Sequence, residues 1–344
     1  MKFIGYNRPL YLLPFDHHDL FKQHQLFGWQ GELTPARSAE IVQAKQVIYD
    51  GFKVAVDAGA ARENAGVLVD EELGADILRD AKARGFVTAC PVEKRGQDEF
   101  DFDYGGDFAK HIEAVQPTFC NAVVRYNPGG DFSLNRRQLL RLRRLSEYLQ
   151  RQSQSRFMLE LRVPPEKAQL DQLKGDQRAY EVKLRPQLML LAIHQLQNCG
   201  IEPDVWSIEG LDRREDCERI VAAARRDGRD NVGCMVLGHG EDEDQVCDWL
   251  MTAADVRGFI GFAVGRTNFW ETLVNLRAQQ IGRERAVWEI ARSFQKLADI
   301  FEKFLPSEPS GERRSRNPAR NVWDGLRQRG PGSPASRRIT GLRN

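Results

Sequence analysis

The feature that most constrains the fold is a regular alternation of short β-rich runs with longer stretches of helical periodicity. Parallel strands need a crossover of about a dozen residues, usually a helix, and strands covered on both faces read as nearly continuous apolar runs. Each β-rich run here is apolar and is followed by a helical pattern. The eight runs are 10–16, 65–71, 86–94, 119–127, 156–163, 204–210, 232–239 and 256–266.

The helical segments carry apolar residues three and four positions apart. Eight strand–helix units in succession predict an α/β protein with a single (β/α)8 TIM barrel over residues 1–305. A doubly wound open sheet is the alternative, because periodicity cannot detect closure, but no GxGxxG follows an early strand. Extra C-terminal helices at 269–279 and 284–305 are expected to close the barrel and pack outside it. The other segments are 74–85, 106–115, 134–152, 185–200, 214–228 and 242–254.

The composition is that of a soluble globular protein whose positive charge is concentrated near the C-terminus. The chain has 344 residues, of which 41% are hydrophobic and 29% charged, and a net charge of +1. The segment 306–344 has nine arginines against three acidic residues, so it carries +6 and the remainder carries −5. We therefore expect no specific nucleic-acid partner for the barrel, and a disordered Arg-rich tail at 306–344. An arginine-rich contact with RNA or an acidic partner is the alternative reading of the tail.

Six cysteines lack any CxxC or framework spacing, and two of them, Cys90 and Cys234, lie inside apolar strand-like runs. This usage is typical of reduced, buried thiols in a cytoplasmic protein. No run approaches the length of a membrane span, so we expect no membrane partner. A homo-oligomer is left open.

Polar residues follow all eight predicted strands, at the end where a TIM barrel carries its active site. Any one of them is compatible with a solvated rim group, and Glu160 with Arg162 could be a structural ion pair. Acids, bases and arginines converging on one mouth nevertheless favour an enzyme. The residues singled out are Asp16, Glu93, Lys94, Arg125, Asn127, Glu160, Ser207, Glu209, His239 and Arg266.

The run "EPDVWSIEG" gives the sharpest local expectation. Alternation places Val205, Ser207 and Glu209 on one face of the strand and Trp206 with Ile208 on the other. A hydroxyl and a carboxylate thus share a face that their neighbours suggest is buried.

Two loops predict a phosphate site. Such sites commonly use the loops after strands 7 and 8, where backbone N–H groups meet a helix N-terminus. The loops "LGHGEDE" and "AVGRTNFW" supply Gly238, Gly240 and Gly265 for close backbone approach and Arg266 for a phosphate oxygen. The alternative is that these glycines only turn the chain.

The stretch 91–108, "PVEKRGQDEFDFDYGGDF", places Phe100, Phe102 and Tyr104 at alternate positions. These aromatic residues could pin a lid against the barrel mouth, or the stretch could be an ordinary packed loop.

The chain resembles the aldolase-like domain of bifunctional myo-inositol catabolism proteins, a 5-dehydro-2-deoxyphosphogluconate aldolase related to class I tagatose-bisphosphate aldolases. The likeness spans about Pro9 to Phe304. It rests on "YLLPFDHHDLFKQHQLFGW", "VDEELGADILRDAKARG", "CPVEKRGQDEFDFDYG", "VVRYNPGGD", "EPDVWSIEGLD" and "GFAVGRTNFWETL".

The resemblance implies retro-aldol cleavage of a phosphorylated sugar acid to dihydroxyacetone phosphate and malonate semialdehyde, with no resident cofactor. Class I members use a lysine Schiff base, expected on strand 6 in a pattern like D-x-W-K-x-E. Ser207 stands at that position, and serine cannot form an iminium. Three readings remain: Lys94 has taken over the covalent role, a metal held by Asp16, His17, His18 or His239 polarises the carbonyl, or the chain binds sugar phosphates without cleaving them.

The resemblance also implies roles for the residues of the mouth. Glu160 and Glu209 become candidates for general acid and base, and Asp16 for orienting a hydroxyl. Arg125 and Arg266 become candidates for holding the substrate carboxylate and phosphate, although Arg125 could instead form a salt bridge with Glu160.

Overall fold

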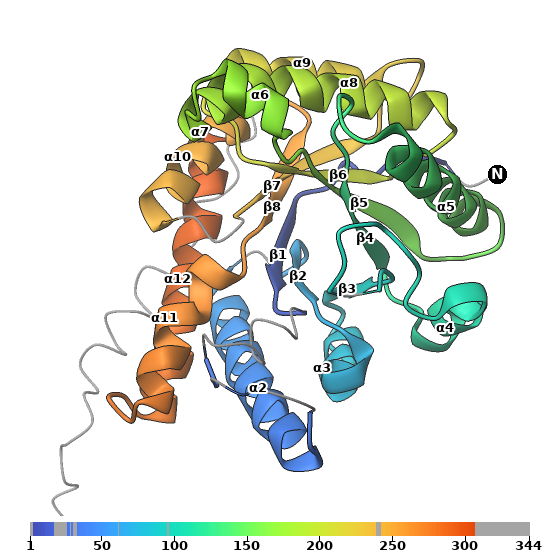
Figure 1. Cartoon of the computed structure of the whole chain (residues 1–344). Helices are drawn as coiled ribbons and strands as arrows, with labels where there is room; N and C mark the ends of the chain where they lie inside the picture. The colour runs from blue at the N-terminus through green and yellow to red at the C-terminus, as the bar shows by residue number, and fades with distance from the viewer. Residues whose placement is uncertain are drawn as a thin grey trace, which may run out of the picture.

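Eight parallel strands form a closed barrel in which each strand pairs with its neighbours in chain order and β8 pairs with β1 (Figure 1). This computed structural model describes residues 3–16, 26–27, 29, 33–60, 62–94, 96–238 and 242–306. The predicted TIM barrel is therefore confirmed, and the open-sheet alternative is excluded.

Each predicted β run contains one strand, and most strands end before their polar residues. The strands are Leu10–Pro14 (β1), Ala65–Leu68 (β2), Val87–Pro91 (β3), Phe119–Arg125 (β4), Arg156–Arg162 (β5), Val205–Glu209 (β6), Gly233–Leu237 (β7) and Phe259–Ala263 (β8).

Helices cover the outside of the barrel (Figure 1). The helix between β1 and β2 was not among the segments singled out from the sequence. The longer helices are Pro35–Asp57 (α2), Glu71–Ala83 (α3), Phe108–Val115 (α4), Phe132–Arg151 (α5), Arg185–Asn198 (α8), Arg214–Arg225 (α9), Glu243–Ala254 (α10), Arg266–Arg277 (α11) and Arg283–Phe304 (α12). The short ones are Gly105–Asp107 (η1), Lys167–Gln172 (α6), Gln177–Ala179 (α7) and the π-helical turn Tyr180–Leu184 (η2).

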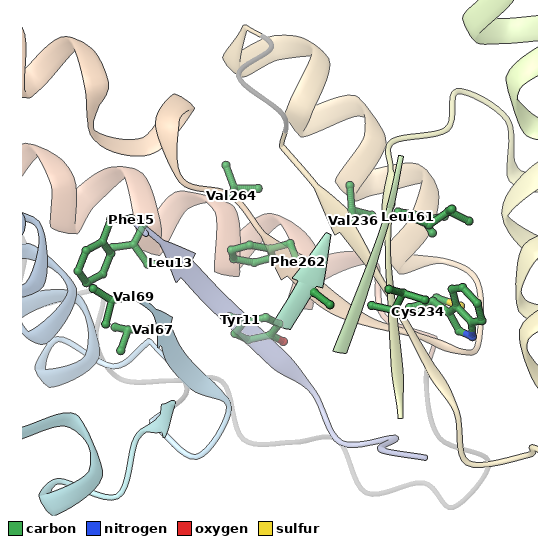
Figure 2. Packing of buried hydrophobic residues seen from close by; sticks show 14 of the residues in the cluster. Tyr11, Leu13, Phe15, Val67, Val69, Leu161, Cys234, Val236, Phe262 and Val264 are labelled. Atoms are coloured by element: carbon green, nitrogen blue, oxygen red, sulfur yellow. The ribbon is translucent and has the colours of Figure 1, made fainter. Parts of the chain in front are cut away.

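Alternation along the strands produces two apolar clusters. The smaller cluster fills the barrel and takes one or two residues from every strand, among them Leu12, Met158 and Val205. The larger cluster lies between the strands and the helices, and includes Trp206 and Ile208. Figure 2 shows part of this outer cluster. The predicted two faces of β6 are thus confirmed.

The C-terminal helix α12 covers α2 and the outer side of β1. Helix α12 packs on α2 through the Phe52 and Phe294 rings, whose centroids are 5.4 Å apart. A methyl group at Gly51 would overlap Ile290, so the two helices approach closely at that point. Phe301 meets Tyr11 of β1 with a ring distance of 5.9 Å. The final helix therefore packs outside the barrel, as predicted.

At the N-terminal end of the strands, a single carboxylate accepts three hydrogen bonds. Asp204, just before β6, accepts hydrogen bonds from the Gly5 N–H (2.9 Å), the Phe157 N–H (2.8 Å) and Arg156 Nη1 (2.9 Å). The N-terminal segment is fixed there to the edges of β5 and β6, away from the strand ends that carry the polar residues.

All six cysteines are free thiols, and five of them, including Cys90 and Cys234, are buried. Within the described residues, no helix combines the length and the apolar character needed to cross a membrane. The predicted tail begins at Pro306, and positions 307–344 lie outside the described residues.

Candidate active site

The C-terminal mouth of the barrel gathers charged side chains that continue the inward-facing series. Glu160 follows Met158 by two positions on β5, and Glu209 follows Val205 by four on β6, so both keep the inward direction. Asp16 stands in the same relation to Leu12 on β1. The carboxylates of all three act to raise the pKa of Arg162, and Glu160 contacts its guanidinium directly.

Glu160 and Arg162 form the inner ion pair of this mouth. Arg162 Nε donates to Glu160 Oε1 at 2.6 Å, and only 20% of the Arg162 side chain and 9% of the Glu160 side chain are exposed. Burial acts to lower the pKa of Arg162, but the carboxylates of Glu160, Glu209 and Asp16 outweigh it and raise that pKa. The arginine is therefore a permanent cation beside the acids, and the structural ion pair that the sequence left open does form.

Glu209 is held by two neighbouring elements. Its Oε2 accepts from the Val163 N–H at 3.0 Å, and its Oε1 lies 3.3 Å from Arg185 Nη1. Arg185 opens α8 and also donates through Nη2 to the Gly210 carbonyl at 2.8 Å. The sequence did not single out this arginine, because nothing in a helix-opening Arg-Pro pair points to a strand that begins twenty residues later.

Ser207 and Asn121 supply the polar atoms inside the barrel wall. Both residues are about 1% exposed, and within the described part of the chain Ser207 Oγ and Asn121 Nδ2 have no hydrogen-bond partner. Ser207 is the register partner of Glu160. A buried donor without a partner costs about 1–3 kcal/mol, so these atoms favour a polar ligand or water. Asn121 was missed, although its inward position follows from alternation with Phe119.

Glu93 and Lys94 diverge at the end of β3. Glu93 is half-buried, pairs with Phe102 in an isolated antiparallel bridge and has the inward parity of Ala89. Lys94 is exposed on the opposite parity, and its N–H donates to the Asp101 carbonyl at 2.8 Å. The structure thus does not bring Lys94 to the acids of the mouth.

Another lysine, Lys45, is fully buried and comes from helix α2. Lys45 of α2 forms an ion pair with Asp70, and Asp70 Oδ1 accepts from the Leu73 N–H at 2.7 Å to cap α3. Lys45 therefore comes from a helix and not from a strand of the barrel wall, and its ammonium is engaged by Asp70. Among the inward-facing strand residues that are described, none is a lysine.

Arg125 and Asn127, at the end of β4, contact neighbouring loops. Arg125 Nη1 donates to the Gln97 carbonyl at 3.2 Å, and its Nε lies 3.7 Å from Asp98 Oδ1. The considered salt bridge with Glu160 is not formed, because Glu160 pairs with Arg162. Asn127 donates through Nδ2 to the Pro164 carbonyl and to Gln169, and its Oδ1 accepts from Gln169 Nε2 and from the Gly129 N–H. Its amide is fully used in shaping these loops.

The loop over 91–108 is packed against α5. Phe100 and Phe102 are buried in the outer cluster, and Phe102 stacks on Phe108 at 4.1 Å. Glu99 forms ion pairs with Arg137 and Arg141 of α5. The alternate aromatic residues do pin the loop, but they pin it to the barrel's flank. The packed-loop reading therefore fits these contacts better than a lid.

The two predicted phosphate loops follow the neighbouring strands β7 and β8. The Gly238 N–H donates to the Ala263 carbonyl at 3.2 Å. A Cβ at Gly265 would overlap the Pro14 carbonyl, so only glycine fits there. Helix α11 begins directly afterwards at half-buried Arg266, which gives the expected helix N-terminus. Asn268 in its first turn is 4% exposed, and its Oδ1 and Nδ2 have no partner within the described residues.

Several predicted residues cannot be compared. His17, His18, His239 and Gly240 lie outside the described residues. The metal arrangement considered for the histidines therefore stays a prediction, as does the part of the phosphate site that uses Gly240.

A family described as "Uncharacterized protein conserved in bacteria (DUF2090)" matches residues 7–304. The chain belongs to this family. The match covers the whole DUF2090 barrel from the segment before β1 to the end of α12. The comparison with curated proteins gives no match.

Two solved structures are similar to this DUF2090 barrel, and the first shares its fold. Fructose-bisphosphate aldolase from Plasmodium falciparum, in complex with TRAP and a small-molecule inhibitor, aligns with a TM-score of 0.58 at 10% identity. That alignment covers 89% of this chain and 93% of the aldolase chain. A Corynebacterium glutamicum structural genomics target aligns with a TM-score of 0.49 at 15% identity, over 86% of this chain and 88% of that chain. The likeness to the aldolase concerns the fold alone.

Proposed function

We propose that this protein is an aldolase-like carbon–carbon lyase acting on a phosphorylated sugar acid, with 5-dehydro-2-deoxy-D-gluconate 6-phosphate as substrate and dihydroxyacetone phosphate and malonate semialdehyde as products. The observation that carries the proposal is the inward-facing group of Asp16, Glu160, Arg162 and Glu209 together with the unpartnered Ser207 hydroxyl. The sequence motifs quoted above support the substrate, and the barrel that an aldolase shares with this chain is compatible with the reaction.

The reaction needs a base and an electron sink. A carboxylate, Glu160 or Glu209, takes the proton from the hydroxyl that is β to the ketone. The bond between the α and β carbons then breaks, the β carbon leaves as the aldehyde of malonate semialdehyde, and the bonding electrons pass to the ketone oxygen as an enediolate. Protonation of the α carbon gives dihydroxyacetone phosphate.

With Ser207 in place of lysine, we propose that the enediolate is stabilised electrostatically instead of through an iminium. Arg162 provides a fixed positive charge, and Asn121 Nδ2 and Ser207 Oγ are buried donors. Donors held in a water-poor site stabilise developing negative charge, and removing one typically slows an enzyme about 100- to 1,000-fold.

The phosphate end is proposed to lie at the start of α11. Arg266 and the adjoining N–H groups suit an anion, and the buried amide of Asn268 adds a donor there. Arg125 and Asn127 are engaged with loops, so a direct role in holding substrate requires that Arg125 leave Asp98, where it is held only across 3.7 Å.

A non-catalytic sugar-phosphate-binding protein is the second candidate. The observation that favours it is Ser207 itself, because the expected covalent nucleophile is missing and no inward-facing strand lysine occurs among the described residues. The same phosphate site and the same charged mouth would then serve for binding alone.

The proposed setting is cytoplasmic carbohydrate breakdown, specifically myo-inositol catabolism. The six free thiols support a reducing compartment. A homo-oligomer is compatible with this role.

The test is a cleavage assay on the full chain with 5-dehydro-2-deoxy-D-gluconate 6-phosphate, with dihydroxyacetone phosphate measured as it forms. We expect turnover that Glu209→Gln and Ser207→Ala each reduce, and that a chelator leaves unchanged. Borohydride treatment with dihydroxyacetone phosphate should give no covalent adduct in the natural chain. An adduct at Lys94, found by mass spectrometry, would refute the electrostatic route, and binding by calorimetry without any turnover would establish the second candidate.

Ser207→Lys extends the test. If position 207 on β6 corresponds to the Schiff-base lysine of class I aldolases, borohydride should trap an adduct at that position of this variant. A variant that folds and binds dihydroxyacetone phosphate but gives no adduct there would contradict the assigned geometry.

A further inference from the structure

Helices α3 and α4 flank β3 (Figure 1). Four polar side chains from these elements and the loop after β3 contact one another, and the proposed lyase chemistry uses none of them. Glu71 opens α3, Cys90 lies in β3 on the face opposite to Ala89, Tyr104 ends the loop that follows β3, and His111 belongs to α4. The residues come from positions far apart in the sequence, so no spacing motif announces them.

The four groups converge on the Glu71 carboxylate. Its Oε2 accepts from Cys90 Sγ at 3.1 Å, and its Oε1 accepts from the Tyr104 hydroxyl at 2.6 Å and lies 3.4 Å from His111 Nε2. The Tyr104 ring stacks on the imidazole at 4.0 Å, which fixes the direction in which Nε2 points. Cys90 is 1% exposed, and the side chains of His111 and Glu71 are 9% and 18% exposed.

One atom each from Glu71, Cys90 and His111 lies within 4.8 Å of the other two. A tetrahedral zinc ion binds thiolate at about 2.3 Å and imidazole or carboxylate at about 2.0–2.2 Å, which puts its ligand atoms about 3.4–3.6 Å apart. The Cys90–Glu71 and Glu71–His111 separations of 3.1 and 3.4 Å are close to that spacing. We propose that Glu71, Cys90 and His111 bind a divalent cation of the zinc class. The mixed sulfur, nitrogen and oxygen set favours zinc or cobalt over magnesium or calcium, which prefer oxygen ligands alone.

The charges around the cluster are of the sign that a cation requires. Burial raises the pKa of the Cys90 thiol, and the carboxylates of Glu71 and Asp70 raise it further. Burial lowers the pKa of His111, while Glu71 and Asp103 act in the opposite direction. The carboxylates of Glu71, Asp70 and Asp103 thus give the cluster the negative potential that a cation would neutralise.

Binding exchanges one proton for the metal. The S–H proton of Cys90 goes to solvent, the thiolate bonds to the cation, and the Cys90–Glu71 hydrogen bond is replaced by two metal–ligand bonds. Three protein ligands leave a fourth position for water or for the nearby Tyr104 hydroxyl. The cation would then join α3, β3 and α4, and so fix the loop between β3 and α4 from the side opposite its contacts with α5.

Without a metal the same groups form a hydrogen-bonded network centred on Glu71, so the experiment has to separate the two arrangements. One sample of the full chain is stripped with a chelator and titrated with Co²⁺, and the titration is followed by absorbance. A second sample is stripped, loaded with Zn²⁺ and desalted, and the zinc that it retains is measured by elemental mass spectrometry. We expect one metal per chain and a thiolate-to-cobalt charge-transfer band in the near ultraviolet.

Variants locate the ion. Cys90→Ala should abolish the band, and His111→Gln should weaken cobalt binding by at least about 10- to 100-fold, the loss typical even of outer-sphere partners. Cys234→Ala is the matched control, because it removes another buried strand cysteine, in β7, and should leave the band unchanged. If Cys90→Ala does not fold, as judged by circular dichroism, His111→Gln on the partly exposed α4 face decides the matter.

Two results would overturn the proposal. One is the absence of a charge-transfer band and of retained zinc in the natural chain. The other is metal binding that His111→Gln leaves unchanged, which would place the ion elsewhere. Lyase activity does not enter either readout, so failure of the proposed function and failure of this site are distinguishable.

Discussion

Replacing Arg162 by methionine tests whether the mouth is a buried electrostatic unit. The variant keeps an unbranched apolar stem but removes the cation that pairs with Glu160, a residue that is 7% exposed. Removing one partner of a buried ion pair typically costs about 3–5 kcal/mol, because the remaining charge is left without compensation. Since 20% of the Arg162 side chain is exposed, we expect the lower end, about 3 kcal/mol.

The loss is measurable by chemical denaturation and by thermal unfolding. Unfolding entropy for a domain of about 300 residues is roughly 0.6 kcal/mol/K, so about 3 kcal/mol lowers Tm by about 5 °C. Arg137→Met is the matched control, because Arg137 pairs with Glu99 at 2.7 Å but is 51% exposed. An exposed pair contributes about 0.2–1 kcal/mol, so the control should lose no more than that, and less still at high salt.

The double variant Arg162→Met/Glu160→Gln completes the cycle. Replacing both partners of a buried pair is often nearly neutral, so the second substitution should restore most of the lost stability. Equal losses for Arg162→Met and Arg137→Met, or a double variant less stable than Arg162→Met alone, would refute the reasoning that burial makes this pair decisive.

Three further predictions concern the barrel. Gly265→Ala should lower the free energy of unfolding by several kcal/mol in a denaturant titration, because the new methyl group meets backbone, whereas Gly282→Ala has open space and should stay within about 0.5 kcal/mol. Asp204→Ala leaves three donors without their acceptor and should cost roughly 3 kcal/mol by the same measurement, with Asp204→Asn in between. Burial raises the pKa of the Cys234 thiol to about 12, so a thiol reagent at pH 8 should label only half-buried Cys199 rapidly, and rapid labelling of Cys234 in the native state would contradict its burial.

The fold could be predicted because its elements are encoded locally. Every apolar run became a strand, since parallel strands covered by helices must be apolar on both faces. The ends were less accurate: the run 65–71 was expected as strand, but Asp70 caps a helix that begins at Glu71. An Asp followed by two glutamates is a helix-start pattern, and it predicts that the strand ends before Asp70.

The site was only partly predictable. Alternation correctly gave the shared face of Ser207 and Glu209, and the same rule separates Glu93 from Lys94 at the end of β3. Alternation cannot show that the Asn127 amide donates hydrogen bonds to Pro164 and Gln169, because these residues lie about forty positions away in the sequence. The cluster around Glu71 was likewise invisible, since tertiary packing alone assembles it.

The contact between α2 and α12 has a consequence for how the protein is made. A nascent chain leaves the ribosome N-terminus first, so α2 and the eight strands emerge before the helix that covers Tyr11 and Phe52. Until residue 304 is released, that apolar strip faces water, and the closing contact spans nearly the whole sequence. A chain stalled before α12 therefore keeps an uncovered apolar strip, and we expect chaperones to bind it.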